Sequence, residues 1–312
     1  MTGAGKAAAA WLLAALLLPC AAALAGDTGT ASCREVPGGT QVASGEARIE
    51  VTTIGRGKPV LLLPSLGRGA HDFDPLVAYL QGGGYQPLLA DPRGFGNSRG
   101  PHPQSLADLA DDMAAVIASL CPGPVDVVGH AFGQRVARML ATRHPDKVHS
   151  LVMLAAGGRL KRSDTVEADL NLISTTEGVA DSDRLPALQR VFFARGNDAR
   201  VWLPGWSVPL ARAQRYADRQ TLVGDWWAGG RTDILVVHAL EDPISEAGNA
   251  ESLAADFGDR VRLVRLAHAS HAMVPEQPRA IAAVIAAFLD GQRDPATLQA
   301  VLDRDVTAPG PP

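Results

Sequence analysis

The pattern of hydrophobic and polar positions divides much of the chain into two kinds of segment, strand-like and helix-like, which alternate along the sequence. Residues 48–53 alternate polar and apolar, as a half-buried strand does, and short apolar runs typical of buried parallel strands occur at 60–63, 88–90, 125–128, 148–154, 234–237 and 261–266. Apolar residues at helical spacing predict helices over 74–81, 105–120, 133–144 and 281–289. Strands that alternate with helices indicate an α/β fold, in which a mostly parallel sheet is covered by helices on both faces.

This alternation lapses between residues 158 and 230, where charged helical stretches mix with tryptophans. The segment follows one predicted core strand and precedes another, so we expect an inserted helical lid over the carboxyl edge of the sheet. We expect Trp202, Trp206, Trp226 and Trp227 to form the core of the lid, where some could also line an apolar substrate pocket. The sheet domain then comprises residues 47–157 and 231–290, preceded by a loose arm at 26–46 and followed by a flexible tail at 291–312.

The N-terminus reads as a secretory signal over residues 1–25. Lys6 supplies the positive charge, residues 7–18 the apolar run, and Ala23 to Ala25 a small-x-small cleavage site. A membrane anchor is the competing interpretation, but a spanning helix needs about 20 apolar residues and Pro19 interrupts the run. We predict cleavage after Ala25, a secreted or periplasmic protein, and no stable membrane anchor in the mature chain.

Composition narrows the possible functions and leaves one covalent question open. The 312-residue chain is 46% hydrophobic, has a net charge of −4, and scatters its basic residues, which argues against nucleic-acid binding. No cofactor or metal is predicted, and the expected partner is a small-molecule substrate or ligand. Cleavage after Ala25 leaves Cys33 and Cys121, and their spacing fits a disulfide and two free thiols equally well.

A strand, a sharp turn and a helix are predicted around residues 127–133, which read Val-Val-Gly-His-Ala-Phe-Gly. This segment resembles the nucleophile elbow G-x-S-x-G of the α/β-hydrolase family, with Ala131 in the serine position. The elbow residue is strained, and small residues two before and two after it let the chain segments pass, a requirement that Gly129 and Gly133 meet. A methyl group cannot attack a carbonyl, so Ala131 removes the usual nucleophile.

The remaining parts of the resemblance follow in the family's chain order of nucleophile, acid and histidine. Residues 234–242 resemble the strand and loop that carry the acid, which implies Asp242, and residues 266–278 resemble the segment that carries the catalytic histidine, which implies His271. The loop after the strand at 60–63 occupies the place of the oxyanion loop, although it lacks the usual His-Gly. By position, the oxyanion donors would be the N–H groups of Leu66 and Phe132. The resemblance spans residues 48–289 and implies an α/β-hydrolase fold.

Other polar residues near these motifs have simpler interpretations. His130, beside the elbow, is expected to have a packing or hydrogen-bonding role, and His268 is expected to be a loop residue. Ser65 borders the predicted site and is a candidate displaced nucleophile, but nothing in the sequence positions its oxygen for His271.

Three functional hypotheses are consistent with alanine at residue 131. In the favoured one, His271 and Asp242 activate a water molecule that hydrolyses a small reactive carbonyl compound, such as an ester or carbamate; the aminoacrylate hydrolase branch of the family is similar in having a small elbow residue. In the second, the protein binds a small ligand without turning it over. In the third, Ala131 replaces the serine of an ordinary esterase.

Overall fold

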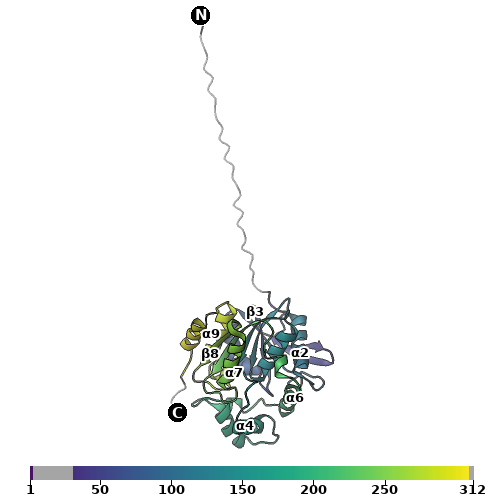
Figure 1. The fold of residues 1–312 in the computed structure, drawn as a ribbon. Helices are drawn as coiled ribbons and strands as arrows, with labels where there is room; N and C mark the ends of the chain where they lie inside the picture. The colour runs from purple at the N-terminus through teal and green to yellow at the C-terminus, as the bar shows by residue number, and fades with distance from the viewer. Residues whose placement is uncertain (3–30, 309–312) are drawn as a thin grey trace.

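The computed structural model describes residues 1–2 and 31–308 and contains one eight-stranded sheet in the order β1-β2-β4-β3-β5-β6-β7-β8 (Figure 1). The strands β3 to β8 are mutually parallel, whereas β2 is antiparallel to both of its neighbours. The strands are β1 (Thr40–Ser44), β2 (Ala47–Thr53), β3 (Lys58–Leu63), β4 (Tyr85–Ala90), β5 (Val125–His130), β6 (Val148–Leu154), β7 (Asp233–Ala239) and β8 (Val261–Leu266). The predicted α/β fold with a mostly parallel sheet is confirmed.

Helices cover both faces of the sheet, as the continuous apolar strands require. One face packs against α2 (Leu106–Leu120), α3 (Phe132–Arg143) and α7 (Ala247–Phe257). The other packs against α1 (Asp74–Gly82), α9 (Pro278–Leu289) and α10 (Pro295–Arg304), while the short α8 (Met273–Glu276) and η1 (Ala70–Phe73) adjoin α1. Successive residues of β3 alternate between the two cores, because Leu61 belongs to the first and Leu62 to the second.

Between β6 and β7 the chain forms a helical insert that lies beyond one edge of the sheet (Figure 1). It contains α4 (Asp164–Ser174), α5 (Asp181–Val191), η2 (Ala199–Trp202), α6 (Val208–Arg219) and η3 (Val223–Asp225). Trp202 is buried in a separate small core of this insert, and Trp206 packs against it. Trp226 and Trp227 instead belong to the core between the sheet and helices α2 and α3, so the prediction of a lid-core position is wrong for these two residues.

The predicted loose arm is partly ordered by backbone pairing and by a covalent link. Residues 40–44 form β1, which pairs with β2 along its whole length. Cys33 is buried, forms a disulfide with Cys121, and donates its N–H to the side chain of Gln86 at 2.7 Å. The sequence did not predict β1, because the segment is mostly polar and Val42 is the one buried hydrophobic side chain of the strand.

The predicted flexible tail at 291–312 also differs from the structure, which has α10 at Pro295–Arg304. Asp294 caps this helix by accepting a hydrogen bond from the N–H of Thr297 at 2.9 Å. Leu298 and Leu302 lie one turn apart and are completely buried against the second core. The two leucines at helical spacing anchor an otherwise polar segment, so the tail is docked on the sheet domain through residue 304.

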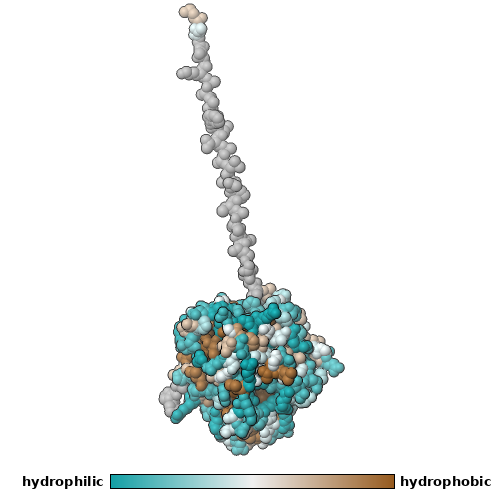
Figure 2. Space-filling view, in the orientation of Figure 1, coloured by the Kyte–Doolittle hydropathy of each residue, from teal (hydrophilic) through white to brown (hydrophobic). Residues whose placement is uncertain are grey.

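Apolar side chains on the surface are dispersed. Figure 2 shows a largely hydrophilic face with apolar residues in separate patches, and the exposed large residues, such as Tyr79, Leu222 and Leu240, come from different elements. In the described part of the chain, no helix is both long and apolar enough to cross a membrane. Nearly all of the predicted signal segment lies outside the described residues.

Candidate active site

The corner between β5 and α3 holds Ala131 in a strained backbone conformation, with φ 50° and ψ −108°. A non-glycine residue in such a region costs about 1–3 kcal/mol. The flanking glycines are sterically required, because a Cβ on Gly129 would lie 2.5 Å from Cα of Gln134 and a Cβ on Gly133 would lie 2.2 Å from the carbonyl oxygen of Leu63. The chain therefore has the sharp elbow that its sequence suggested, with a methyl group at the tip.

Asp242 and His271 come together from the loops that follow β7 and β8. Nδ1 of His271 lies 2.9 Å from Oδ2 and 3.1 Å from Oδ1 of Asp242, and both side chains are buried. Asp242 Oδ1 also accepts hydrogen bonds from the N–H groups of Ile244 at 2.8 Å and Ser245 at 2.9 Å. The carboxylate is thus held from both sides.

These contacts keep Asp242 ionised. Burial by itself raises the pKa of Asp242, but the facing His271 and the N–H groups of Ser245 and Ile244 outweigh burial and lower the pKa below its ordinary value. A carboxylate at this position accepts a hydrogen bond from the N–H at Nδ1 of His271, which leaves the lone pair of Nε2 free. His271 therefore has the tautomer that a general base needs.

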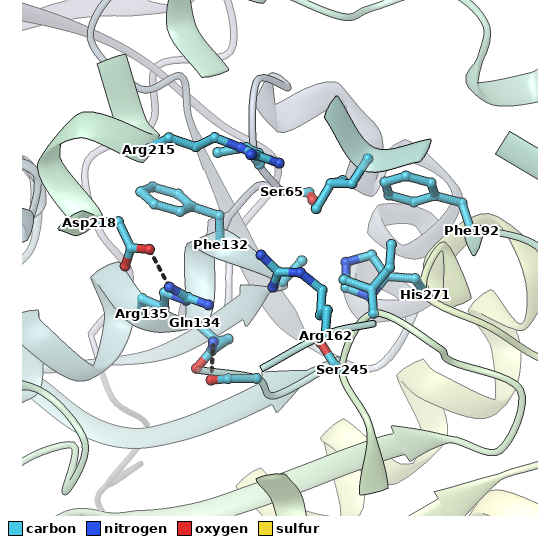
Figure 3. Close-up of a pocket in the computed structure, with 15 residues that line it drawn as sticks. Ser65, Phe132, Gln134, Arg135, Arg162, Phe192, Arg215, Asp218, Ser245 and His271 are labelled. Carbon is cyan, nitrogen blue, oxygen red and sulfur yellow. Dashed lines mark hydrogen bonds and ion pairs between the residues drawn. The ribbon is translucent and has the colours of Figure 1, made fainter. Parts of the chain in front are cut away.

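His271 and Ala131 line the same central cavity, together with Leu66 and Phe132 (Figure 3). Its volume is about 70 Å³, and one water needs ~10–15 Å³ of such space. The cavity thus has room for water beside the Ala131 methyl group and for a small ligand.

The backbone N–H groups of Leu66 and Phe132 donate no hydrogen bond to any described residue. Phe132 is the first residue of α3, so its N–H has no partner within the helix and lies at the positive end of the helix dipole. The Leu66 loop is held by its neighbour Gly67, whose N–H donates to Gln214 Oε1 at 2.7 Å and whose carbonyl accepts from Ser207 N at 2.8 Å. Two free donors beside the cavity form a candidate oxyanion hole.

His130 supports the loop that carries His271. Burial, followed by the neighbouring His271, lowers the pKa of His130 to about 3, so the ring is neutral at physiological pH. Its Nε2 lies 2.7 Å from the backbone carbonyl of His271, and the ring packs edge-on against Trp202 at 5.8 Å between centroids. A neutral imidazole that donates from Nε2 to a carbonyl fixes the backbone of residue 271, which makes His130 a positioning residue.

Ser65 is buried and also lines the central cavity. Within the described chain, however, its hydroxyl forms no hydrogen bond with His271. A serine without that contact has no base to activate it. His268, in turn, is an exposed residue of the loop after β8.

Glu276 is a supporting residue that the sequence did not reveal. Its carboxylate accepts hydrogen bonds of 2.7 Å from the N–H groups of Ser270 and Ala194 and from the amide of Asn197, so it ties the His271 loop to the insert. Burial raises the pKa of Glu276 despite these donors. The sequence could not predict this role, because two of the three donors to Glu276, Ala194 and Asn197, lie about 80 residues away in the chain.

Three arginines beside the cavity, Arg135, Arg162 and Arg215, were likewise not anticipated. They come from α3 and from the insert, and no local motif unites them. Among the described residues, no group of three or more His, Cys, Asp or Glu side chains is arranged to hold a metal ion.

Comparison with known proteins supports the same architecture. A family model described as alpha/beta hydrolase fold matches residues 58–221, which is more than half of the chain. The chain is 33% identical over 138 residues to a protein from Azorhizobium caulinodans named "Putative carbamate hydrolase RutD", covering 43% of this chain and 52% of that protein. It is 38% identical over 104 residues to a pimeloyl-[acyl-carrier protein] methyl ester esterase from Neisseria meningitidis, covering 33% and 38% respectively. The chain thus matches about half or less of these relatives' lengths.

Solved structures extend the likeness to about four fifths of the chain. An esterase from Exiguobacterium antarcticum has a TM-score of 0.68 at 21% identity, covering 81% of this chain and all of that one. The structure of Rv0554 from Mycobacterium tuberculosis has a TM-score of 0.69 at 24% identity, covering 82% of this chain and all of that one. At these identities the likeness is one of fold alone.

Proposed function

Because this chain belongs to the alpha/beta hydrolase fold family, we propose that it hydrolyses a small, reactive carbonyl compound, an ester or a carbamate, without a covalent intermediate. The observation that carries this proposal is the buried His271–Asp242 pair, whose histidine lines the same cavity as Ala131. The names of two relatives, a carbamate hydrolase and a methyl ester esterase, agree with this class of substrate.

In the proposed reaction, water takes the place that a serine hydroxyl would fill. His271 Nε2 accepts a proton as the water oxygen bonds to the carbonyl carbon, and Asp242 stabilises the imidazolium that forms. The carbonyl oxygen becomes an oxyanion, which the N–H groups of Leu66 and Phe132 stabilise. The tetrahedral intermediate then collapses, the bond to the leaving group breaks, and His271 returns its proton to that group.

The size of these effects limits the substrate. General base catalysis contributes about 100- to 10,000-fold, and an oxyanion hole with substrate binding adds a factor of about 1,000 to 10,000 over water. These factors are modest for an enzyme and suffice for activated esters and carbamates, whose uncatalysed hydrolysis is already fast. An amide lies beyond their reach.

The test compares hydrolysis of 4-nitrophenyl acetate by the parent chain, His271→Ala and His71→Ala. His71 is the matched control, because its side chain is 80% exposed. We expect His271→Ala to lose about 100-fold or more in rate, imidazole in the buffer to restore part of it, and His71→Ala to retain the parent rate. Absence of turnover over a panel of esters, carbamates and thioesters, with saturable binding of the same compounds, would favour the ligand-binding hypothesis instead.

A second variant tests the geometry independently of the natural reaction. Ala131→Ser places a hydroxyl at the elbow. His271, which lines the same cavity, and the free N–H groups would make that hydroxyl react with a fluorophosphonate probe. We expect the Ala131→Ser variant to be labelled, and we expect the double variant that also carries His271→Ala to remain unlabelled. If Ala131→Ser folds but remains unlabelled, the inferred arrangement of base and oxyanion donors is wrong.

We also propose that the protein is exported, with a mature chain that begins at Gly26. The disulfide between Cys33 and Cys121 supports this, because disulfides persist mainly in oxidising compartments. N-terminal sequencing of the protein from fractionated cells tests the proposal, and an unprocessed chain recovered from the cytoplasm would overturn it.

A further inference from the structure

Three arginines line the central cavity, and they form ion pairs with only two carboxylates among the described residues. Arg135 forms an ion pair with Asp218, and that pair is balanced. Glu167 is shared, since it lies 3.0 Å from Nε of Arg162 and 2.9 Å from Nη1 of Arg215. Two guanidiniums facing one carboxylate leave one positive charge in excess.

The shared carboxylate also affects the pKa values of Glu167 and Arg215. Burial raises the pKa of Glu167, but Arg162 and Arg215 together lower it below its ordinary value. Burial lowers the pKa of Arg215, and the nearby Arg162 and Arg219 lower it further, although Glu167 acts in the opposite direction. An arginine remains charged in a protein under such influences, so the wall of the cavity is electropositive.

Hydrogen-bond donors are also left over. Nε of Arg162 is bound to Glu167, but its two terminal amino groups donate to no described residue, and its side chain remains 26% exposed. Nη1 of Arg215 is bound to Glu167 and Asn171, whereas its buried Nη2 has no partner among the described residues. Figure 3 shows the guanidinium groups of Arg162 and Arg215 turned toward the space between Phe132 and His271.

We propose that the central cavity binds an anionic substrate, whose carboxylate pairs with Arg162 and Arg215 while its ester or carbamate carbonyl faces His271. Planar guanidinium groups match the geometry of a carboxylate, and one excess positive charge matches a monoanion better than a phosphate dianion. Arg162, Arg215 and His271 all line this one cavity, so a single ligand can contact both arginines and the histidine. This inference rests on the proposed function and adds the substrate class to it.

The binding test uses glutarate monomethyl ester and its neutral partner, dimethyl glutarate, titrated into the full chain by calorimetry. We expect the anion to bind more tightly than the neutral ester, and Arg162→Met and Arg215→Met each to weaken its binding about 10- to 100-fold. Arg162→Lys keeps the charge and should recover part of the affinity. Melting curves establish that each variant is folded, because Arg215 also links α6 to α4.

Two further variants separate a local site from general charge. Arg212→Met removes the same charge from the same helix, but Arg212 is 54% exposed and pairs with Glu177 outside the cavity lining, so the affinity should stay within about twofold of the parent. Glu167→Gln removes the shared counter-charge and should tighten anion binding about 2- to 5-fold. Equal weakening by Arg212→Met, or no effect of both cavity variants, would overturn the proposal.

The rates for mono-4-nitrophenyl glutarate and 4-nitrophenyl pentanoate distinguish failure of this inference from failure of the proposed function. Arginine-dependent binding of the anion with hydrolysis of neither ester would retain the anion site and refute hydrolysis. Equal hydrolysis of both esters without arginine-dependent binding would refute the anion site and retain hydrolysis. Preferential hydrolysis of the glutarate ester, lost in Arg162→Met, is the expected outcome.

Discussion

Replacing Asp242 by Asn should abolish the base without disturbing the packing around it. The N–H groups of Ile244 and Ser245 both donate to Oδ1. The amide oxygen of Asn must take that position, because the amide NH₂ group is itself a donor and cannot accept from them. The amide nitrogen then faces Nδ1 of His271, where Oδ2 now lies at 2.9 Å. Since an NH₂ group can only donate, His271 must accept through Nδ1 and carry its proton on Nε2.

An Nε2 that carries the proton cannot accept one from water, so the expected rate loss is the whole contribution of general base catalysis. That is about 100- to 10,000-fold, or about 2.7–5.4 kcal/mol in activation free energy. The assay is hydrolysis of 4-nitrophenyl acetate, combined with ¹⁵N NMR of the histidine rings to identify the tautomer of His271. Asp146→Asn is the matched control, because its side chain is 69% exposed.

The same variant has a defined effect on acid stability. The folded pKa of Asp242 lies below its ordinary value, so the stabilisation from its ionisation is present above the unfolded pKa and is lost as the pH falls through the folded value. Urea unfolding between pH 2 and 5 should therefore show a weaker pH dependence in Asp242→Asn than in the parent.

The rate measurement can refute the mechanism. If Asp242→Asn changes the tautomer of His271 but leaves the rate of 4-nitrophenyl acetate hydrolysis unchanged, the general-base mechanism is wrong.

Three predictions concern the scaffold, each measured by urea unfolding. Removing the disulfide by Cys33→Ala with Cys121→Ala should cost up to about 4–5 kcal/mol by the chain-entropy model, because the bridge spans 88 residues; an unchanged midpoint would contradict this. Leu298→Ala should cost about 2–5 kcal/mol, since the side chain is completely buried, and a loss below 0.5 kcal/mol, typical of a surface site, would show that α10 is not docked. Gly133→Ala should destabilise the elbow by more than about 1 kcal/mol, because its Cβ would clash with the carbonyl of Leu63, and a variant as stable as the parent would refute that corner geometry.

The strands and helices of the sheet domain were predictable because their burial repeats at short range. A run such as residues 60–63 is apolar throughout because both faces of that strand are covered, and α2 began where expected because Asp108 accepts the N–H of Ser105, its capping residue. The positions of Ala131, Asp242 and His271 at strand ends followed from the same pattern. Parallel strands present their carboxyl ends at one edge, so residues after different strands meet there.

Elements with weak local signals were missed for a related reason. The strand β1 is stabilised by backbone pairing with β2, and backbone hydrogen bonds leave little trace in side-chain type. Helix α10 depends on two leucines within a polar segment, and their burial is provided by the sheet domain rather than by the helix. Residues with so few apolar contacts resemble a loop until their neighbours are known.

The sequence by itself determined the alternating architecture and the places of Ala131, Asp242 and His271 after three of the strands, because each of these features is encoded within a few consecutive residues. Only the tertiary structure decided which charges meet above the elbow. Glu167 and Arg215 are 48 residues apart, and His130 and the carbonyl of His271 are 141 apart. Such contacts depend on how the insert and the loops pack against the sheet, and no periodicity along the chain records that packing.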